Sequence, residues 1–121
     1  MNSLSDDDIF VIDKKNALGD MTIDQFIAKL KSIMHGKVAE LYLFGSYAKG
    51  TAHSDSDIDI IIVCDTDWEF HKRVLLFPEV FDLSFDIEMR IYTIKEFEKI
   101  KSNAKNNAFW KEVLETATKI I

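Results

Sequence analysis

The stretch Leu43-Phe-Gly-Ser-Tyr-Ala-Lys-Gly-Thr-Ala-His-Ser-Asp-Ser-Asp-Ile-Asp-Ile-Ile-Ile-Val63 decides how this chain is organised. It indicates the end of one strand, a Gly-Ser turn, a short helical segment with a loop, and a second strand. Asp57 and Asp59 start that second strand two residues apart, so their side chains are expected on one face. Two adjacent carboxylates repel by about 4 kcal/mol at roughly 4 Å and an effective dielectric near 20. A cation would offset this repulsion, so the stretch predicts a metal–nucleotide site.

The composition is that of an ordinary globular protein. The chain has 121 residues, is 47% hydrophobic and 30% charged, and carries a formal charge of −6. We expect one domain over residues 1–121 with a core from about 22 to 118. An acidic surface repels a phosphate backbone, which disfavours general nucleic-acid binding. The single cysteine, Cys64, and the absence of a long apolar run in the sequence predict a cytoplasmic protein without a membrane span.

Capping signals and hydrophobic periodicity predict the secondary structure. Capping boxes start at Thr22, Thr66 and Thr93 and predict helices over about 23–35, 67–77 and 94–102. A final amphipathic helix is expected from about residue 108. Strands are predicted at 9–12, 38–44, 57–64 and 81–92, the last from a clean alternation of apolar and polar residues. Helices that alternate with strands predict an α/β domain layered around a small sheet.

The Gly-Ser turn has the properties of a phosphate-binding turn. Gly45 permits a sharp departure from the strand and lets a phosphate approach the backbone without a Cβ in the way. Ser46 is expected to cap the following helix and to offer its hydroxyl to a phosphate oxygen. Lys49 adds positive charge nearby.

A metal at the two aspartates would need a further carboxylate. Mg²⁺ prefers oxygen ligands, and two such ions about 3.5–4 Å apart would need roughly three carboxylates. Asp57 and Asp59 supply two of them, and the third has to come from another strand. Asp86 and Glu88 are the candidates, because both lie on the polar face of the predicted strand 81–92.

The pattern Gly45-Ser46-x-Ala48-x-Gly50, five residues, then Ser56-Asp57-x-Asp59 resembles the signature of the minimal nucleotidyltransferases of the DNA polymerase beta superfamily. The similarity extends loosely over about residues 22–118. The resemblance implies a small mixed sheet flanked by helices and transfer of a nucleoside monophosphate, AMP from ATP, to a hydroxyl acceptor with release of pyrophosphate. It also implies dependence on two Mg²⁺ ions.

Carried over by position, the resemblance assigns roles to individual residues. It places nucleotide binding at Gly45, Ser46, Lys49 and Ser56 and metal binding at Asp57 and Asp59. Counting back from the third capping box favours Glu88 as the third metal ligand and catalytic carboxylate, although relatives usually have aspartate at that position. Asp86 has the expected chemistry but lies two residues earlier. The alternative stays open at this point.

The resemblance also suggests a partner. The short chain is similar to antitoxin-type members that work with a HEPN-type helical protein, which the enzyme would adenylylate. The competing hypothesis is a non-catalytic nucleotide-binding module that neutralises such a partner by contact. Exposed aromatic residues in the last helix, Phe109 and Trp110, would indicate a partner or homo-oligomer interface.

Overall fold

The structure is a computed structural model that describes residues 17–84 and 86–121. Along the chain the elements are α2 (Ile23–Met34), β1 (Glu40–Phe44), α3 (Gly45–Lys49), β2 (Ile58–Val63), the 3-10 helices η1 (Phe70–Leu76) and η2 (Pro78–Asp82), β3 (Ile87–Tyr92), α4 (Ile94–Asn103), the 3-10 turn η3 (Ala104–Asn106), α5 (Ala108–Thr116) and β4 (Thr118–Lys119). The strand predicted at residues 9–12 lies outside the described residues.

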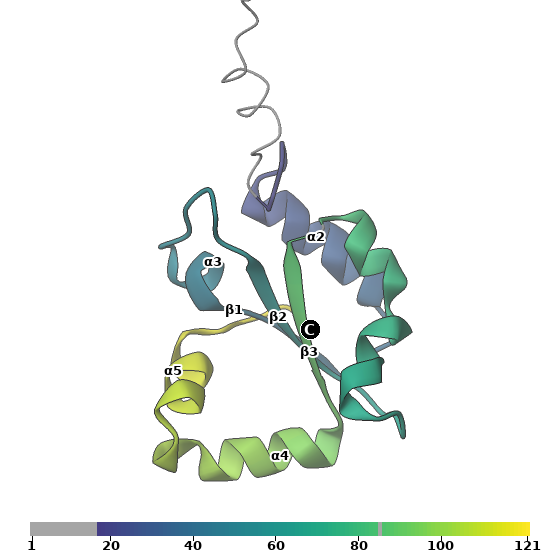
Figure 1. The fold of residues 1–121 in the computed structure, drawn as a ribbon, viewed down its shortest axis with the longest axis vertical. Coiled ribbons are helices and arrows are strands. Elements are labelled where there is room, and N and C mark those ends of the chain that lie inside the picture. Colours follow the sequence, from purple (N-terminus) through teal and green to yellow (C-terminus); the bar gives the residue numbers. More distant parts are fainter. Residues whose placement is uncertain (1–16, 85) are drawn as a thin grey trace, which may run out of the picture.

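Four strands form one mixed sheet in the order β3-β2-β1-β4 (Figure 1). β1 pairs antiparallel with both β2 and β4, whereas β2 and β3 run parallel. The predicted fold class, a small mixed sheet flanked by helices, is therefore confirmed. The two-residue strand β4 was not predicted, because it is too short to show a period.

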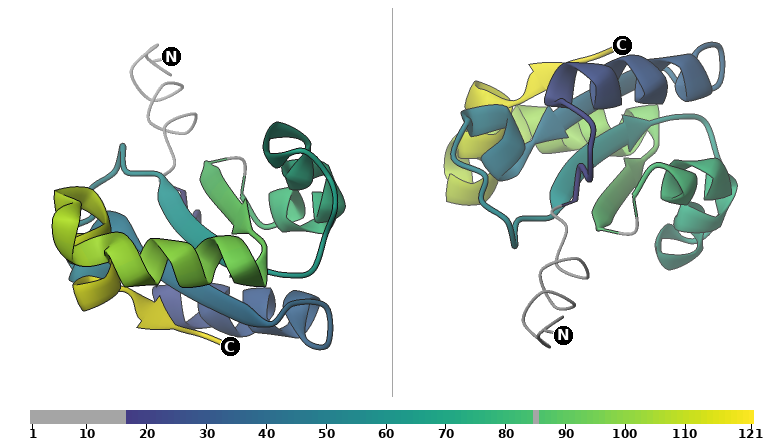
Figure 2. Two further views of the ribbon diagram at one scale, coloured as in Figure 1. Left: turned by 90° about the horizontal axis from the view of Figure 1, so that it is seen from below. Right: turned by 90° about the horizontal axis from the view of Figure 1, so that it is seen from above.

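The sheet separates two hydrophobic cores, and the helices divide between its faces (Figure 2). One core joins α2, η1 and η2 to the face that carries Ile58, Ile60 and Ile62. The other joins α4 and α5 to the face that carries Ile61 and Val63. The predicted division of the residues of β2 between two faces is thus confirmed, and the aspartates share the face covered by α4 and α5.

Two of the three predicted capping boxes are present. Thr22 and Gln25 exchange hydrogen bonds at the start of α2, and Thr93 and Glu96 do the same at the start of α4. Past the end of α2, Gly36 adopts a φ of +78°, as expected for a residue that ends a helix.

The prediction for residues 66–77 was wrong. The Thr66 hydroxyl accepts a hydrogen bond from the Trp68 N–H instead of capping a helix three residues on. The segment then forms the 3-10 helix η1, which begins at Phe70 and has no side-chain cap. Pro78 does not simply end a helix but starts η2, since its fixed φ suits the first turn.

The prediction of a long strand over residues 81–92 was also wrong for the first half of that segment. Only Ile87–Tyr92 forms a strand, and Asp86 precedes it. A strand needs a neighbour, and β2 offers its first paired residue, Ile58, opposite Ile87. Alternation alone does not reveal where that neighbour begins.

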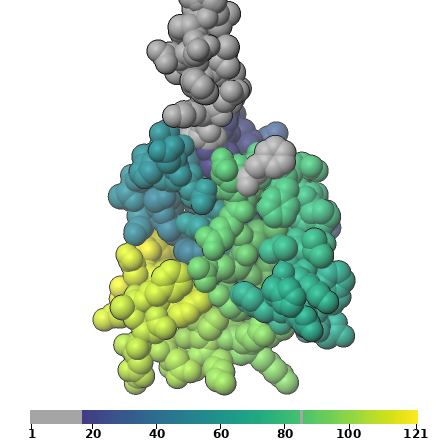
Figure 3. Space-filling view, in the orientation of Figure 1, coloured from purple at the N-terminus to yellow at the C-terminus, as the bar shows by residue number. Residues whose placement is uncertain are grey.

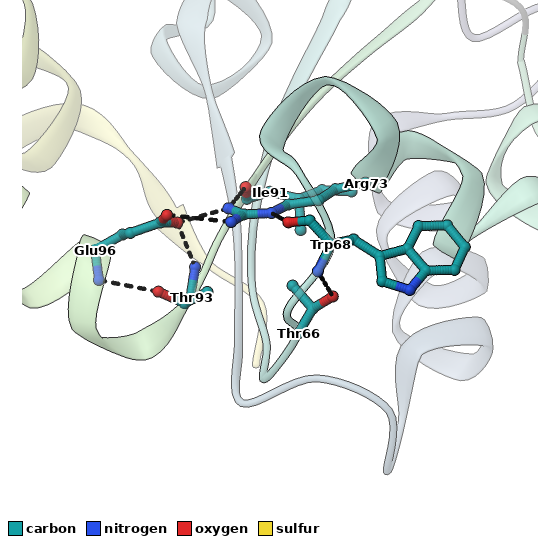
Figure 4. A network of polar contacts seen from close by, with 6 residues as sticks. All are labelled: Thr66, Trp68, Arg73, Ile91, Thr93 and Glu96. Atoms are coloured by element: carbon teal, nitrogen blue, oxygen red, sulfur yellow. Dashed lines mark hydrogen bonds and ion pairs between the residues drawn. The ribbon is translucent and has the colours of Figure 1, made fainter.

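A buried arginine joins η1 to the sheet and to α4 (Figure 4). The side chain of Arg73 donates to the Trp68 and Ile91 carbonyls at 2.9 and 3.0 Å and binds the Glu96 carboxylate through both terminal nitrogens at 2.6 and 3.1 Å. The Glu96 carboxylate also accepts a hydrogen bond from the Thr93 N–H, so it both caps α4 and pairs with Arg73. The hydrogen bonds from Arg73 lower the pKa of Glu96.

Within the described residues, no helix is both long enough and apolar enough to cross a lipid bilayer.

We predict that Arg73→Met lowers the free energy of unfolding by about 2–4 kcal/mol, because it removes the hydrogen bonds of a buried guanidinium to two carbonyls and to the Glu96 carboxylate. Urea denaturation measures the loss. Lys72→Met is the matched control, since the exposed side chain of Lys72 pairs with exposed Glu69 at 3.8 Å, and it should change stability by less than about 0.5 kcal/mol. Equal effects of the two substitutions would contradict this assignment.

Candidate active site

The turn after β1 brings the backbone against a carboxylate. Gly45 has a φ of +72°, and a Cβ built on it would overlap with Asp59 Oδ2 and lie 3.2 Å from Asp59 Cγ. Only glycine therefore fits between the end of β1 and the start of β2. Gly50, also at positive φ, closes α3 by donating its N–H to the Ser46 carbonyl.

The expected cap at Ser46 is not formed. α3 begins at Gly45, its N-cap is Phe44, and that cap makes no side-chain hydrogen bond. Because the helix starts two residues earlier than predicted, with Phe44 instead of Ser46 at the N-cap, Ser46 lies inside the helix.

Parallel pairing of β2 with β3 sets two carboxyl groups side by side. Asp59 is in register with Glu88, and the two carboxyl groups lie close enough to share a hydrogen bond when one of them is protonated. Burial, then the hydrogen bond and charge of Glu88, and then the charge of Asp57 raise the pKa of Asp59 to about 6, whereas Arg90 acts in the opposite direction. Asp59 is therefore the carboxyl group on which a proton would compete with any bound cation.

The other two candidate carboxylates, Asp57 and Asp86, lie just before their strands. Both are exposed, and the Ile58 N–H donates to the Asp86 carbonyl at 2.8 Å. After burial, the charges of Asp86 and Asp57 raise the pKa of Tyr47. Asp57, Asp86 and Glu88 line a depression on the surface beside Asp59. All four predicted carboxylates thus gather at one end of the parallel strands.

A cavity of about 230 Å³ opens next to Asp59 and Glu88. It lies where α3, β3 and α5 adjoin, in blue-green, green and yellow in Figure 3. Its lining combines acidic, basic and apolar side chains: Phe44, Gly45, Lys49, Asp59, Glu88, Arg90, Phe109, Glu112, Val113 and Thr116.

The two remaining predicted nucleotide-binding residues differ in their surroundings. Lys49 lines the cavity, and its Nζ lies 3.2 Å from Glu112 Oε1 on α5. Ser56 instead closes the loop before β2, where its Oγ accepts from the His53 N–H at 2.9 Å.

The polar or exposed cavity residues Arg90, Phe109 and Glu112 were not predicted to belong to the site. Arg90 follows Glu88 by two residues on the same face of β3, which was the available signal for it. Phe109 was read as a core or interface residue, and Glu112 carried no signal. Their place depends on how α5 packs, which local sequence does not show.

The donor set suits a hard divalent cation in its chemistry. Asp59 and Glu88 present carboxylate oxygens in contact, and a cation would relieve their mutual repulsion. Within the described part of the chain, however, no three side chains of Asp, Glu, His or Cys are gathered closely enough to hold an ion. The pair Asp59–Glu88 is therefore the preformed part of the site, with Asp57 and Asp86 beside it.

Comparison with known proteins agrees with this geometry. The family model for the nucleotidyltransferase domain matches residues 23–112, which include the glycine turn and every candidate carboxylate. The chain belongs to this family and is a nucleotidyltransferase. A relative from Methanocaldococcus jannaschii, named "Putative protein adenylyltransferase MJ0604", is 35% identical over 97 residues, which are 77% of this chain and 88% of the relative.

Solved structures support the fold. A toxin–antitoxin structure with AMP-PNP matches with a TM-score of 0.51 and 22% identity, over 83% of this chain and 73% of that chain. A mutant of the toxin–antitoxin pair MntA–HpeT matches with a TM-score of 0.50 and 20% identity over the same shares. At these identities the likeness shows a shared nucleotidyltransferase fold.

The close approach at Gly45 can be tested with two glycines of equal conformation. Gly45→Ala should lower the free energy of unfolding by about 2–4 kcal/mol through backbone strain and overlap with Asp59. Gly50→Ala, at a φ of +74° with no atom within 4 Å of the new Cβ, should cost only the strain, about 1 kcal/mol. In an Asp59→Ala background the cost of Gly45→Ala should fall to that of Gly50→Ala in chemical denaturation. A cost that stays the same in that background would rule out the overlap.

The raised pKa of Asp59 predicts a pH-dependent stability in EDTA. The folded protein keeps a proton up to about pH 6, whereas the unfolded chain releases it near 3.8, so this stabilisation is complete below about pH 4 and is lost as pH rises through 6. Between pH 4 and 8, the free energy of unfolding of the wild-type protein should therefore fall by about 1–2 kcal/mol relative to that of Asp59→Asn. Urea denaturation of both proteins across this range measures the difference, and a constant difference would refute the assignment.

Proposed function

We propose that this nucleotidyltransferase transfers AMP from ATP to a hydroxyl group, with Mg²⁺ as its cofactor. The observation that carries the proposal is the contact of the Asp59 carboxyl with both Glu88 and the bare backbone of Gly45. This contact puts paired oxygen ligands next to a turn that a phosphate can approach, at the edge of a cavity of about 230 Å³.

Each candidate residue then has a role. The triphosphate lies along Gly45, Ser46 and Lys49, and Ser56 holds the loop that leads to Asp57. Asp57, Asp59 and Glu88 hold two Mg²⁺ ions. Bound Mg²⁺ supplies positive charge against the charge that develops on the transferred phosphoryl group and on pyrophosphate.

In the reaction, the acceptor hydroxyl attacks the α-phosphorus in line as the bond to the β-phosphate oxygen breaks and pyrophosphate leaves. A carboxylate takes the hydroxyl proton. Glu88 is favoured for this role over Asp86, because Glu88 contacts Asp59 whereas Asp86 lies outside the strand. The preorganised site contributes mainly by positioning and by electrostatic stabilisation.

We further propose a protein acceptor, a HEPN-type helical partner in the cytoplasm. The name of the Methanocaldococcus jannaschii relative, a protein adenylyltransferase, supports a protein as acceptor. The exposed aromatic ring of Phe109 at the rim of the cavity offers contact area for such an acceptor.

The test is transfer of label from α-³²P-ATP with Mg²⁺ to a co-purified partner or to the chain itself. Asp59→Asn and Glu88→Gln should each reduce transfer by at least about 100-fold while circular dichroism stays unchanged. Asp86→Asn decides the open alternative, and it should reduce transfer by less than about fivefold if Glu88 is the catalytic carboxylate. Asp82→Asn, an exposed aspartate on η2, is the matched control.

Full transfer by Asp59→Asn would sink the proposal. Nucleotide binding and partner neutralisation without any transfer by the wild-type protein would favour the non-catalytic module instead.

A further inference from the structure

The two arginines of the chain have opposite surroundings. Arg73 is buried and uses Nε and both terminal nitrogens in hydrogen bonds. Arg90 has a side chain that is 34% exposed, and its Nε, although buried, has no hydrogen-bond partner among the described residues. A structural arginine has its donors satisfied, as Arg73 does, so Arg90 does not fit that role.

The contacts that Arg90 does make orient its guanidinium without saturating it. One terminal nitrogen lies 3.6 Å from Glu88 Oε2, which is a long ion pair. The guanidinium carbon lies 5.2 Å from the centre of the Phe109 ring. The ring lies against one face of the guanidinium, and the N–H donors of the two terminal nitrogens point along the plane of the group instead of toward the ring.

Arg90 lines the same cavity as Asp59 and Glu88. Arg90 and Lys49 are its two cations, and Asp59, Glu88 and Glu112 are its acids. The Nζ of Lys49 lies 3.2 Å from Glu112, whereas the ion pair of Arg90 with Glu88 is longer, at 3.6 Å, so Arg90 is the less tightly paired cation of this cavity. Its place beside Asp59 and Glu88 puts it within the site where a nucleotide would bind.

We propose that Arg90 binds the phosphate chain of the nucleotide donor. This inference rests on the proposed function and adds a binding residue to it. A guanidinium offers two parallel N–H donors to two phosphate oxygens, a match that an ammonium group does not provide. Phe109 holds the guanidinium plane at the cavity, and Glu88 occupies one terminal nitrogen only loosely, so a phosphate can take it over.

The test is the affinity for ATP, measured by isothermal titration calorimetry with MgCl₂, together with the thermal midpoint of each variant. Arg90→Gln should weaken ATP binding by about tenfold or more, and Arg90→Lys should recover part of the loss. Lys111→Met removes an equal charge from the exposed part of α5 and should change the affinity by less than twofold. The dissociation constant should also depend less on salt in Arg90→Gln than in the wild-type protein.

A purely structural Arg90 would behave differently. Arg90→Gln would then lower the thermal midpoint and leave the ATP affinity within twofold of wild type, which would overturn the inference. If Arg90→Gln does not fold, Arg90→Lys decides, because it keeps the charge and loses the paired donors. A loss of about threefold or more would support the proposal, and an unchanged affinity would overturn it.

Transfer by the wild-type protein is measured in parallel. Transfer together with an ATP affinity independent of Arg90 would overturn the inference and leave the proposed function standing. Arg90-dependent ATP binding without transfer would support the inference and count against the proposed function.

Discussion

The parallel pairing of β2 with β3 is the constraint on which the candidate site depends. It puts partly buried Asp59 beside exposed Glu88, a placement that costs free energy while both are charged. The turn at Gly45 then packs bare backbone against the same carboxyl group, so that side chain cannot swing away from Glu88 in that direction. The repulsion persists because the sheet, with a core on each face, holds the two strands together. The raised pKa of Asp59 is the measurable sign of this arrangement.

Local interactions explain what the sequence could predict. Capping boxes at Thr22 and Thr93 are satisfied within four residues of chain, and the alternation within β2 is visible without knowledge of any partner. The spacing of Gly45, Asp57 and Asp59 likewise lies within one stretch. The fold class and these candidate residues could therefore be predicted from the sequence.

The errors share a physical origin in long-range contacts. Residues 81–86 alternate like a strand, but the neighbouring strand begins pairing only at Ile58, opposite Ile87. Thr66 has the spacing of a cap, yet the segment after it is held by Arg73, whose partners lie on β3 and α4. Arg90 and Phe109 are 19 positions apart and meet only because α5 packs on the face of the sheet that carries the aspartates. None of these partners can be identified from a window of neighbouring residues.

The division of the interior into two cores has a consequence for how the protein can change. Phe26, Leu30 and Met34 of α2 pack on the face of the sheet that points away from the cavity. The sheet lies between these side chains and the cavity, whereas a change in Val113 or Phe44 alters the cavity wall itself. Substitutions that raise thermal stability without altering activity are therefore expected on the α2 side of the sheet. Substitutions that change substrate preference are expected on the α5 side.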